Sequence, residues 1–444
     1  MAPINDNTLR ALEAYLQRHD GIELYTPRSP EYEDLRESFV IRPARPFAIV
    51  RPQTAADVQA SIQFILHHDV DFNIRSGGHD SAGRSQIDGG LLIDMRDLDY
   101  FQISKDRTRA RVGGGIQLGR LAELLGKQDL ITPTGSVASV GYTGWSTLGG
   151  YGPFSSLYGL GVDQIVGAKL VNSNGEIIEA SDELLAGLRG GGGNFGVVVE
   201  LTINVYPLKQ VCESLLHGRG FVSKIVELHF QAEILASTLI YNSTDMLDTW
   251  TLFSERYDEL QQKEGIPDAL QVQQFAMEYP GFGKALPFHQ FVQNQEAVTP
   301  WPAYGRSHSI SLKEFTLKSL AVLANYSSLL PGGGVGLAVH ELRHPKPNDA
   351  SVFGNRLHHH MLEILSVTTD QDYVESGEQW ALGLEANLRK EDPTNILGGY
   401  ISLMDDDETD LKLVYGKHYE TLLGLKREYD PRNTFRYAIP RLPA

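Results

Sequence analysis

Glycine is concentrated in one stretch of the chain. Residues 75–196 contain 26 of the 44 glycines, whereas an even distribution over 444 residues would place about 12 there. Because glycine lacks a Cβ atom, it adopts backbone conformations that other residues avoid and lets another backbone or a ligand approach closely. This stretch is therefore predicted to form tight loops that lie against something large and flat or phosphorylated.

Length and composition exclude several classes of protein. The chain is long enough for two or three domains, and 41% hydrophobic with 21% charged residues is typical of a folded protein. A net charge of −17 repels phosphate backbones and anionic lipids, so neither nucleic acid nor membrane is expected as a partner. Cys212 is the only cysteine, which excludes a disulfide within the chain and any multi-thiolate metal site.

The N-terminal sequence gives an expectation about location. Charges occur throughout residues 1–20, without the apolar stretch of a signal peptide, and no run of 18 apolar residues occurs in the sequence. We therefore expect an intracellular, cytoplasmic protein.

Hydrophobic patterning predicts a mixed α/β region up to about residue 206. Residues 47–50 form an apolar run, and Thr54 with Asp57 is typical of a helix cap, followed by Val58, Ile62 and Ile65 on one helical face. Further strands are predicted at 72–75, 91–94 and 110–112, and a helix at about 118–127. Glycine loops separate these elements.

The pattern changes after Pro207. Alternating runs predict strands at 271–277, 334–340 and 358–365, and helical patterns occur at about 245–260, 313–329 and 371–389. We expect one antiparallel sheet with helices on one face, leaving the other face free to roof a cavity. A last helix is predicted at about 411–429, and the acidic run Asp405 to Glu408 is interpreted as a solvated turn.

The segment Gly191 to Gly196 matches the G-x-G-x-x-G pattern of nicotinamide dinucleotide sites. That site needs a strand before the glycines and a helix after them, so that the helix N-terminus meets the pyrophosphate. Here a helical pattern at 184–189 precedes the glycines and a strand pattern at 197–203 follows. The sequence therefore does not favour a nicotinamide site.

Three more glycine loops lie at 75–80, 135–141 and 144–152. Each alone is most simply a tight turn, but four such loops within 122 residues favour a phosphate-bearing cofactor laid along the backbone. His79 follows a predicted strand, where a solvent-exposed turn would favour Asn or Asp. It is either a polar turn residue or a chemically active one.

The ordered motifs resemble those of a known family. They are Arg75-Ser-Gly-Gly-His79, Gly141-x-x-Gly144 running into Gly149-Gly-Tyr-Gly152, Gly159-Leu-Gly-Val-Asp163, Arg189-Gly-Gly-Gly-Gly-Asn-Phe-Gly196 and Tyr429-Asp-Pro-Arg-Asn-Thr-Phe435. In this order they resemble the berberine bridge enzyme-like flavoproteins, a branch of the vanillyl-alcohol oxidase fold with a PCMH-type FAD-binding domain. The resemblance covers nearly the whole chain and is far more specific for family than for substrate.

The resemblance implies an α+β architecture. It implies an FAD-binding domain of two α/β subdomains at 1–206, with its core at about 43–206, and a substrate domain at 207–395 whose antiparallel sheet is covered by helices on one face. A C-terminal segment at 396–444 would rejoin the FAD-binding domain. His79 would be bonded to the flavin 8α-methyl, which raises the reduction potential and retains the flavin.

The resemblance also implies a set of FAD contacts. They are Arg75, Ser76, Gly77, Gly78, His79, Asp80, Gly135, Ser136, Val140, Gly141, Gly144, Trp145, Gly149, Gly150, Gly152, Val198, Tyr400 and Asn433. Val137 stands where many members carry the cysteine of a second flavin link, so His79 would be the only covalent link. Val140 matches the valine of the family's oxidases, which implies that oxygen reaches the flavin.

The family's usual catalytic base is missing. Relatives use a tyrosine or a glutamate over the flavin, but Leu403 stands where that tyrosine would be and Ser402 where asparagine is common, although Tyr400 matches. Leu362 takes the place of the glutamate, and strand alternation puts Glu363 on the opposite face.

His358 and His360 share the strand face of Leu362. Because a histidine of near-neutral pKa is a competent base, His360, His358 and Tyr400 are the predicted catalytic residues. Alternatively, the histidines only line a polar cavity. A zinc site is less favoured because alternate strand residues supply two ligands without an evident third, and no metal is predicted. Trp145 and Tyr151 are predicted to wall the cavity or to serve packing.

These features predict an FAD-dependent oxidase. It would take a hydride from a small organic molecule, such as an alcohol, amine or activated C–H of a specialised metabolite, onto flavin N5, with molecular oxygen as electron acceptor. Loss of the usual base leaves open a non-redox flavoprotein that performs isomerisation or cyclisation. A carrier that only binds a ligand is a third possibility.

Overall fold

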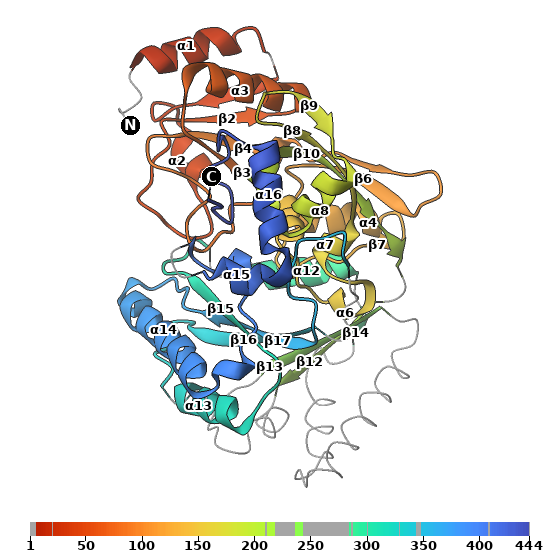
Figure 1. The fold of residues 1–444 in the computed structure, drawn as a ribbon, viewed down its shortest axis with the longest axis vertical. Coiled ribbons are helices and arrows are strands. Elements are labelled where there is room, and N and C mark those ends of the chain that lie inside the picture. Colours follow the sequence, from red (N-terminus) through yellow and green to blue (C-terminus); the bar gives the residue numbers. More distant parts are fainter. Residues whose placement is uncertain are drawn as a thin grey trace.

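The computed structural model describes residues 6–443 except 20, 209–210, 218–235, 243–283, 286, 300, 328, 343–347 and 407–408. The helix predicted at 245–260 and the strand predicted at 271–277 lie outside the described residues. In Figure 1 the elements of the first two hundred residues form the upper part, and a second group of sheets and helices forms the lower part.

The first part contains a small, mostly parallel sheet. Its elements are α1 (Asp6–Leu16), β1 (Ile22–Tyr25), α2 (Tyr32–Arg36), β2 (Ala48–Pro52), α3 (Ala55–His68), β3 (Phe72–Arg75) and β4 (Leu91–Asp94), with strand order β1-β2-β4-β3 and β1 antiparallel to β2. Thr54 and Asp57 form the predicted cap of α3, because each side chain accepts a hydrogen bond from the other's backbone N–H. Val58, Ile62 and Ile65 are buried as predicted.

A second sheet follows and is antiparallel. Its elements are β5 (Phe101–Ile103), β6 (Arg109–Gly113), α4 (Leu118–Gly126), β7 (Leu130–Ile131), α5 (Tyr142–Thr147), α6 (Ser155–Tyr158), α7 (Gly161–Gln164), β8 (Ile165–Val171), β9 (Ile177–Glu179), α8 (Asp182–Gly191), β10 (Val197–Asn204) and β11 (Tyr206–Pro207). The sheet order is β5-β6-β10-β8-β9, and β11 pairs with β7. Helix α8 precedes strand β10, which confirms the order predicted around Gly191 to Gly196.

The described strands of the lower part form two three-stranded sheets rather than one. The elements are β12 (Val211–His217), β13 (Ala236–Asn242), β14 (Lys284–Ala285), α12 (Phe288–Val298), β15 (Ser307–Leu312), α13 (Leu317–Ser327), β16 (Gly336–Leu342), β17 (His359–Leu365) and α14 (Val374–Glu391), and the sheets are ordered β13-β12-β14 and β15-β17-β16. Helices α13 and α14 cover one face of the second of these sheets (Figure 1). There Leu362 and Ile364 pack in one cluster with Trp380.

The C-terminal residues return to the first part of the chain. The helix predicted at 411–429 is divided into α15 (Leu411–Tyr415) and α16 (Tyr419–Tyr429), because Gly416 takes a φ of 52°. Tyr415 donates a hydrogen bond to the carbonyl of Gly190 at 2.9 Å, and Lys426 donates to the carbonyl of Asn194 at 3.3 Å. None of the helices in the described ranges has the length and apolar character that crossing a bilayer requires. The domain boundaries at 206 and 395 stay predictions.

Candidate active site

A cavity of about 660 Å³ lies between the glycine loops of the first part and the sheet β15-β17-β16. This volume is typical of small-molecule sites. Most residues predicted to contact a cofactor line it, namely Arg75, Ser76, Gly77, Gly78, His79, Asp80, Gly135, Ser136, Val140, Gly141, Gly144, Trp145, Val198 and Tyr400. Loops that are far apart in the sequence therefore meet at one cavity.

Four predicted contacts do not line the cavity: Gly149, Gly150, Gly152 and Asn433. A Cβ on Gly152 would lie 1.9 Å from the carbonyl oxygen of Thr134, and one on Gly150 would lie 2.6 Å from Gly161 Cα. These glycines are needed where the chain packs against itself. Asn433 takes a φ of 51° in a turn closed by its N–H to the carbonyl of Asp430. Their assignment as cofactor contacts is corrected accordingly.

The loop that carries His79 is held rigidly and has unused donors. Arg75 is buried and pairs with Asp94 at 2.8 Å. A Cβ on Gly77 would lie 2.2 Å from the backbone nitrogen of Gly141, so this loop and the 135–144 loop touch backbone to backbone. No acceptor among the described residues takes a hydrogen bond from the N–H groups of Gly77, Gly78 and His79. Such consecutive free N–H groups bind phosphate oxygens, so the cavity fits a dinucleotide such as FAD.

His79 is enclosed by aromatic rings. Its ring centroid lies 5.0 Å from that of Phe39 and 5.1 Å from that of Trp301. Burial lowers the pKa of His79 to about 4, and Glu296 opposes this shift only in part. The imidazole is therefore neutral at physiological pH and carries one proton.

The hydrogen bonds of His79 determine which nitrogen carries that proton. Ser139 Oγ lies 2.7 Å from Glu296 Oε1, and a carboxylate can only accept, so the serine hydroxyl donates to Glu296. His79 Nε2 lies 2.7 Å from the same Ser139 Oγ and must then be the donor. Nδ1 of His79 therefore carries the lone pair. Glu296, on α12, had no signal in the sequence that linked it to His79.

Two tyrosines and a histidine lie together beside the cavity. Tyr400 Oη accepts a hydrogen bond from the N–H of Gly150 at 3.2 Å, and burial raises the pKa of Tyr400 to about 12. The ring centroid of Tyr151 lies 4.9 Å from that of Tyr400 in an edge-to-face arrangement. Tyr151 Oη lies 2.7 Å from Nε2 of His359, a buried residue that the sequence patterns did not single out.

The prediction that His358 and His360 face the cavity is wrong. His360 lies on the strand face of Leu362, which helices α13 and α14 cover, and its ring stacks on Phe315 with centroids 4.4 Å apart. His358 contacts His360 edge-on at 5.6 Å. Neither histidine lines the cavity. Both faces of β17 carry apolar residues, so strand alternation separates the faces without showing which one the helices cover.

The cavity face of β17 carries Glu363 instead. Met361, Glu363 and Leu365 line the cavity, and Glu363 Oε2 lies 2.9 Å from Nε2 of His340 on the neighbouring strand β16. This carboxylate–imidazole pair is the only such pair that we find on the cavity wall within the described residues. Alternation placed Glu363 opposite Leu362 correctly, but the sequence analysis assigned the cavity to the wrong face.

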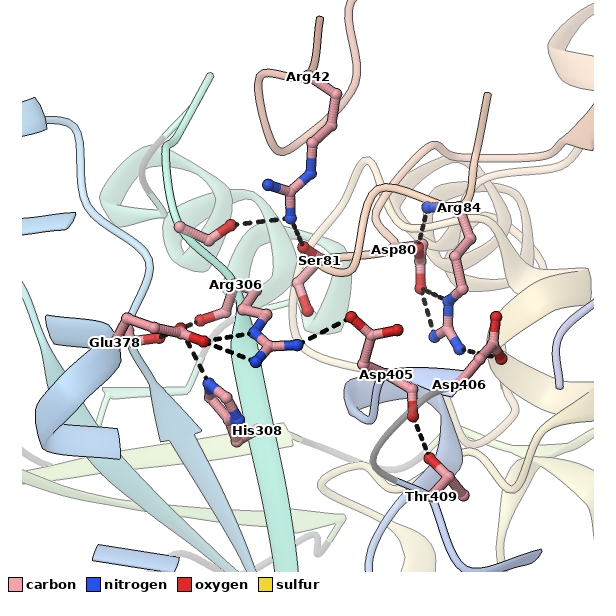
Figure 2. Close-up of polar contacts among 12 residues, drawn as sticks. Arg42, Asp80, Ser81, Arg84, Arg306, His308, Glu378, Asp405, Asp406 and Thr409 are labelled. Atoms are coloured by element: carbon pink, nitrogen blue, oxygen red, sulfur yellow. Dashed lines mark hydrogen bonds and ion pairs between the residues drawn. The ribbon is translucent and has the colours of Figure 1, made fainter. Parts of the chain in front are cut away.

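Ion pairs tie the wall next to His79 to three parts of the chain (Figure 2). Arg84 contacts Asp80 at 2.7 Å and Asp406 at 3.0 Å. Figure 2 shows Arg306, which directly precedes β15, between Glu378 and Asp405, and its distances to them are 2.6 and 2.8 Å. Asp405 is thus paired with the partly buried Arg306 and Asp406 with the buried Arg84, which corrects the interpretation of these two residues as part of a solvated turn. Asp407 and Glu408 of the acidic run lie outside the described residues.

A histidine also takes part in this network. His308 Nε2 lies 3.1 Å from Glu378 Oε2. Although burial of the Glu378 carboxyl opposes ionisation, the hydrogen bonds from His308 and Arg306 lower the pKa of Glu378 to about 2. Arg42 adds a link, because it donates to the carbonyl oxygens of Ser81 and Gly305 at 2.8 and 3.2 Å (Figure 2).

Comparison with known sequences identifies an FAD-binding family. Residues 46–181 match the model of a family described as FAD binding domain. The FAD-linked oxidoreductase aurO of Gibberella zeae is 32% identical over 463 positions, covering 100% of this chain and 90% of the relative. The (R)-6-hydroxynicotine oxidase of Paenarthrobacter nicotinovorans is 38% identical over 170 residues, 37% of each protein.

Solved structures share the fold. A berberine bridge enzyme variant in complex with (S)-reticuline superimposes with a TM-score of 0.81 over 100% of both chains at 19% identity. Glucooligosaccharide oxidase from Acremonium strictum, described as carrying a 6-S-cysteinyl, 8α-N1-histidyl FAD, gives 0.75 over 95% of this chain and 97% of that one, at 19% identity.

The fold and the cavity define a flavoprotein of the PCMH type. The chain belongs to the berberine bridge enzyme-like family of FAD-linked oxidoreductases. FAD is therefore its cofactor, and redox chemistry is its class of reaction.

Proposed function

We propose that the protein is an oxidase that carries FAD on His79 and removes a hydride from a small organic substrate held against Tyr151, Tyr400 and Glu363. When bound, FAD supplies the hydride acceptor at N5 and passes the electrons to molecular oxygen. The observation that carries the proposal is that a neutral histidine with a free Nδ1 lone pair and a carboxylate–imidazole pair line the same cavity.

His79 is proposed as the only covalent link to FAD. Its Nε2 is occupied by Ser139, so Nδ1 is the nitrogen available for a bond to carbon. The glucooligosaccharide oxidase carries an N1-histidyl link and an additional cysteinyl link. In this chain Val137 stands on the cavity wall in the loop where that cysteine is expected, and a valine side chain forms no such bond.

His340 and Glu363 are proposed to receive the substrate proton. Oxidation of an alcohol or amine removes a proton from oxygen or nitrogen as well as a hydride from carbon. When neutral His340 donates its Nε2 proton to Glu363, the other ring nitrogen has a lone pair, and the carboxylate stabilises the imidazolium that results from protonation. This pair replaces His358 and His360 in the role predicted from the sequence.

The cavity wall also supports proposals about the substrate and about the access of molecular oxygen. A small organic molecule, of the kind found in specialised metabolism, fits a cavity that combines apolar walls with a few polar groups. Val140 lies on the cavity wall, and its small side chain supports access of oxygen. The proposed active-site residues that contact substrate are Tyr151, Tyr400, His340 and Glu363.

An anaerobic titration tests the proposal. The holoenzyme is mixed with a panel of candidate alcohols and amines without oxygen, and the flavin absorbance at about 450 nm is followed. Bleaching by a substrate, followed by recovery and peroxide formation when oxygen is admitted, is the expected result. Product formation with the flavin still oxidised and no oxygen consumed would instead establish the non-redox isomerase or cyclase.

A further inference from the structure

His359 lies behind the cavity wall and has a single possible arrangement of protons. Its side chain is fully buried, and Nδ1 lies 2.7 Å from the carbonyl oxygen of Leu357. A carbonyl oxygen only accepts, so Nδ1 carries a proton. Burial lowers the pKa of His359 to about 4, so a second proton is absent at neutral pH. Nε2 of His359 is therefore an acceptor.

This arrangement fixes the hydrogen bonding of Tyr151. Tyr151 Oη lies 2.7 Å from the accepting Nε2 of His359 and must donate its only proton there. The Tyr151 ring is held edge-on between Phe353 and Tyr400, with centroids 6.4 and 4.9 Å away. These rings pack against Tyr151, which lines the cavity, and its phenolic oxygen has only lone pairs left for any further partner.

Tyr400 is arranged in the opposite way. Its oxygen accepts the N–H of Gly150, so its own proton remains available to a neighbour. The cavity wall thus presents one tyrosine that only accepts and one that can donate. The two tyrosines therefore differ in hydrogen-bonding polarity because His359 takes the proton of Tyr151.

We propose that His359 is a positioning residue that holds Tyr151 as a hydrogen-bond acceptor and thereby selects substrates that present a hydroxyl or amine hydrogen to Tyr151. The proposal rests on the proposed oxidase function and names its substrate class: alcohols and amines are preferred to aldehydes, ketones and ethers of the same shape. His359 does not relay the proton further, because its Nδ1–H ends at a peptide carbonyl that cannot take it up.

Ligand binding to the oxidised holoenzyme tests the selection without turnover. Phenol and anisole differ by one hydroxyl hydrogen and neither has a carbinol C–H to transfer as hydride, so their dissociation constants can be obtained from perturbation of the flavin spectrum. The wild type is expected to prefer phenol by about 10- to 100-fold. His359→Gln, whose amide oxygen still accepts from Tyr151, should keep that preference. His359→Leu, which frees the tyrosine proton, should lose or reverse it.

A second measurement does not depend on the ligand probes or on the His359 variants. In ¹⁵N-histidine-labelled wild-type holoenzyme, a two-bond ¹H–¹⁵N correlation spectrum should show His359 with Nδ1 protonated and Nε2 unprotonated, and Tyr151→Phe should shift the Nε2 resonance. Protonation at Nε2, or an unchanged ligand preference in His359→Leu, would overturn the proposal. Both measurements use the oxidised protein and need no flavin reduction. Failure of the His359 proposal can therefore be distinguished from failure of the oxidase proposal, which the anaerobic titration tests.

Discussion

His79 Nε2 lies 2.7 Å from the hydroxyl of Ser139, which in turn is anchored on Glu296. The contact does more than hold a ring in place. Because the serine hydroxyl is committed to the carboxylate, the lone pair of His79 is directed to Nδ1. Residues from two distant parts of the chain therefore prepare the nitrogen that we propose as the flavin link.

Replacing His79 with alanine is expected to leave FAD bound only by non-covalent contacts. The flavin should then appear in the supernatant after acid precipitation, whereas wild-type flavin stays with the protein pellet. Absorbance of the two fractions measures the distribution. Flavin retained in the pellet by the alanine variant would rule out His79 as the link.

Ser139→Ala is expected to lower the covalently bound fraction without abolishing FAD binding. Without the serine hydroxyl, His79 Nε2 loses the acceptor that fixes its tautomer, so Nδ1 is protonated in part of the molecules. The ratio of pellet to supernatant flavin in freshly expressed protein measures this. Thr143→Ala, which removes a hydroxyl from the cavity wall away from His79 Nε2, is the control and should keep wild-type attachment. Equal ratios in the two variants would contradict the orienting role of Ser139.

Glu363→Gln should lower kcat by about 100-fold, because general base catalysis typically contributes 10²- to 10⁴-fold. The FAD content, measured from the absorbance ratio at about 450 and 280 nm, should stay unchanged because the loops proposed to bind FAD belong to the first part of the chain and not to β17. His360→Leu, on the helix-covered face of the same strand, is the control and should retain near-normal kcat. Similar losses in both variants would mean that the effect comes from the strand and not from the carboxylate.

The folded protein should lose stability as the pH falls from 6.5 to 4, in part through His359. Its folded-state pKa of about 4 is below the ordinary value of 6.5, so in this window the unfolded chain takes up a proton that the folded chain refuses. The contribution over the window is of order 3 kcal/mol. Urea unfolding of wild type and His359→Gln at a series of pH values should give a shallower pH dependence for the variant, and identical slopes would contradict a neutral buried His359.

Arg306→Met should destabilise the fold by about 1 to 3 kcal/mol, because Glu378 and Asp405 lose the cation that they share in a partly buried setting. Lys417→Met is the matched control, since its pair with Asp349 is exposed on both sides and should contribute close to nothing. Urea unfolding at neutral pH compares the two. A loss in the control as large as in Arg306→Met would contradict the proposed importance of burial.

Local sequence signals predicted much of the fold. The cap formed by Thr54 and Asp57, and the order of helix α8 before strand β10, depend on residues within a few positions of one another, so a linear pattern contains the whole cause. The positions of the glycine loops were predicted correctly for a similar reason. The role of each glycine could not be predicted, because whether Gly152 faces a cavity or the carbonyl of Thr134 depends on a residue 18 positions away.

The chemistry on the substrate side depends on long-range packing. Which face of β17 meets the cavity is decided by where α13 and α14 lie, and these helices pack on Leu362 and Ile364. Strand alternation therefore showed correctly that His360 and Glu363 lie on opposite faces of β17. It did not show which face meets the cavity, so the prediction placed His360 there instead of Glu363. Glu296 acts on Ser139 and His359 acts on Tyr151, and each of these partners is more than 150 positions distant, so no local motif marks them.

The ion pairs around Arg84 and Arg306 have a consequence for the order in which this protein matures. Asp405 and Asp406 form ion pairs beside the cavity wall, Phe435 and Tyr437 line the cavity, and all four follow His79 by more than 300 positions. A ribosome must therefore synthesise this whole stretch after His79 before the cofactor compartment closes. The proposed flavin attachment at His79 would then report that translation has passed Tyr437, and a chain terminated before Asp405 is expected to stay colourless.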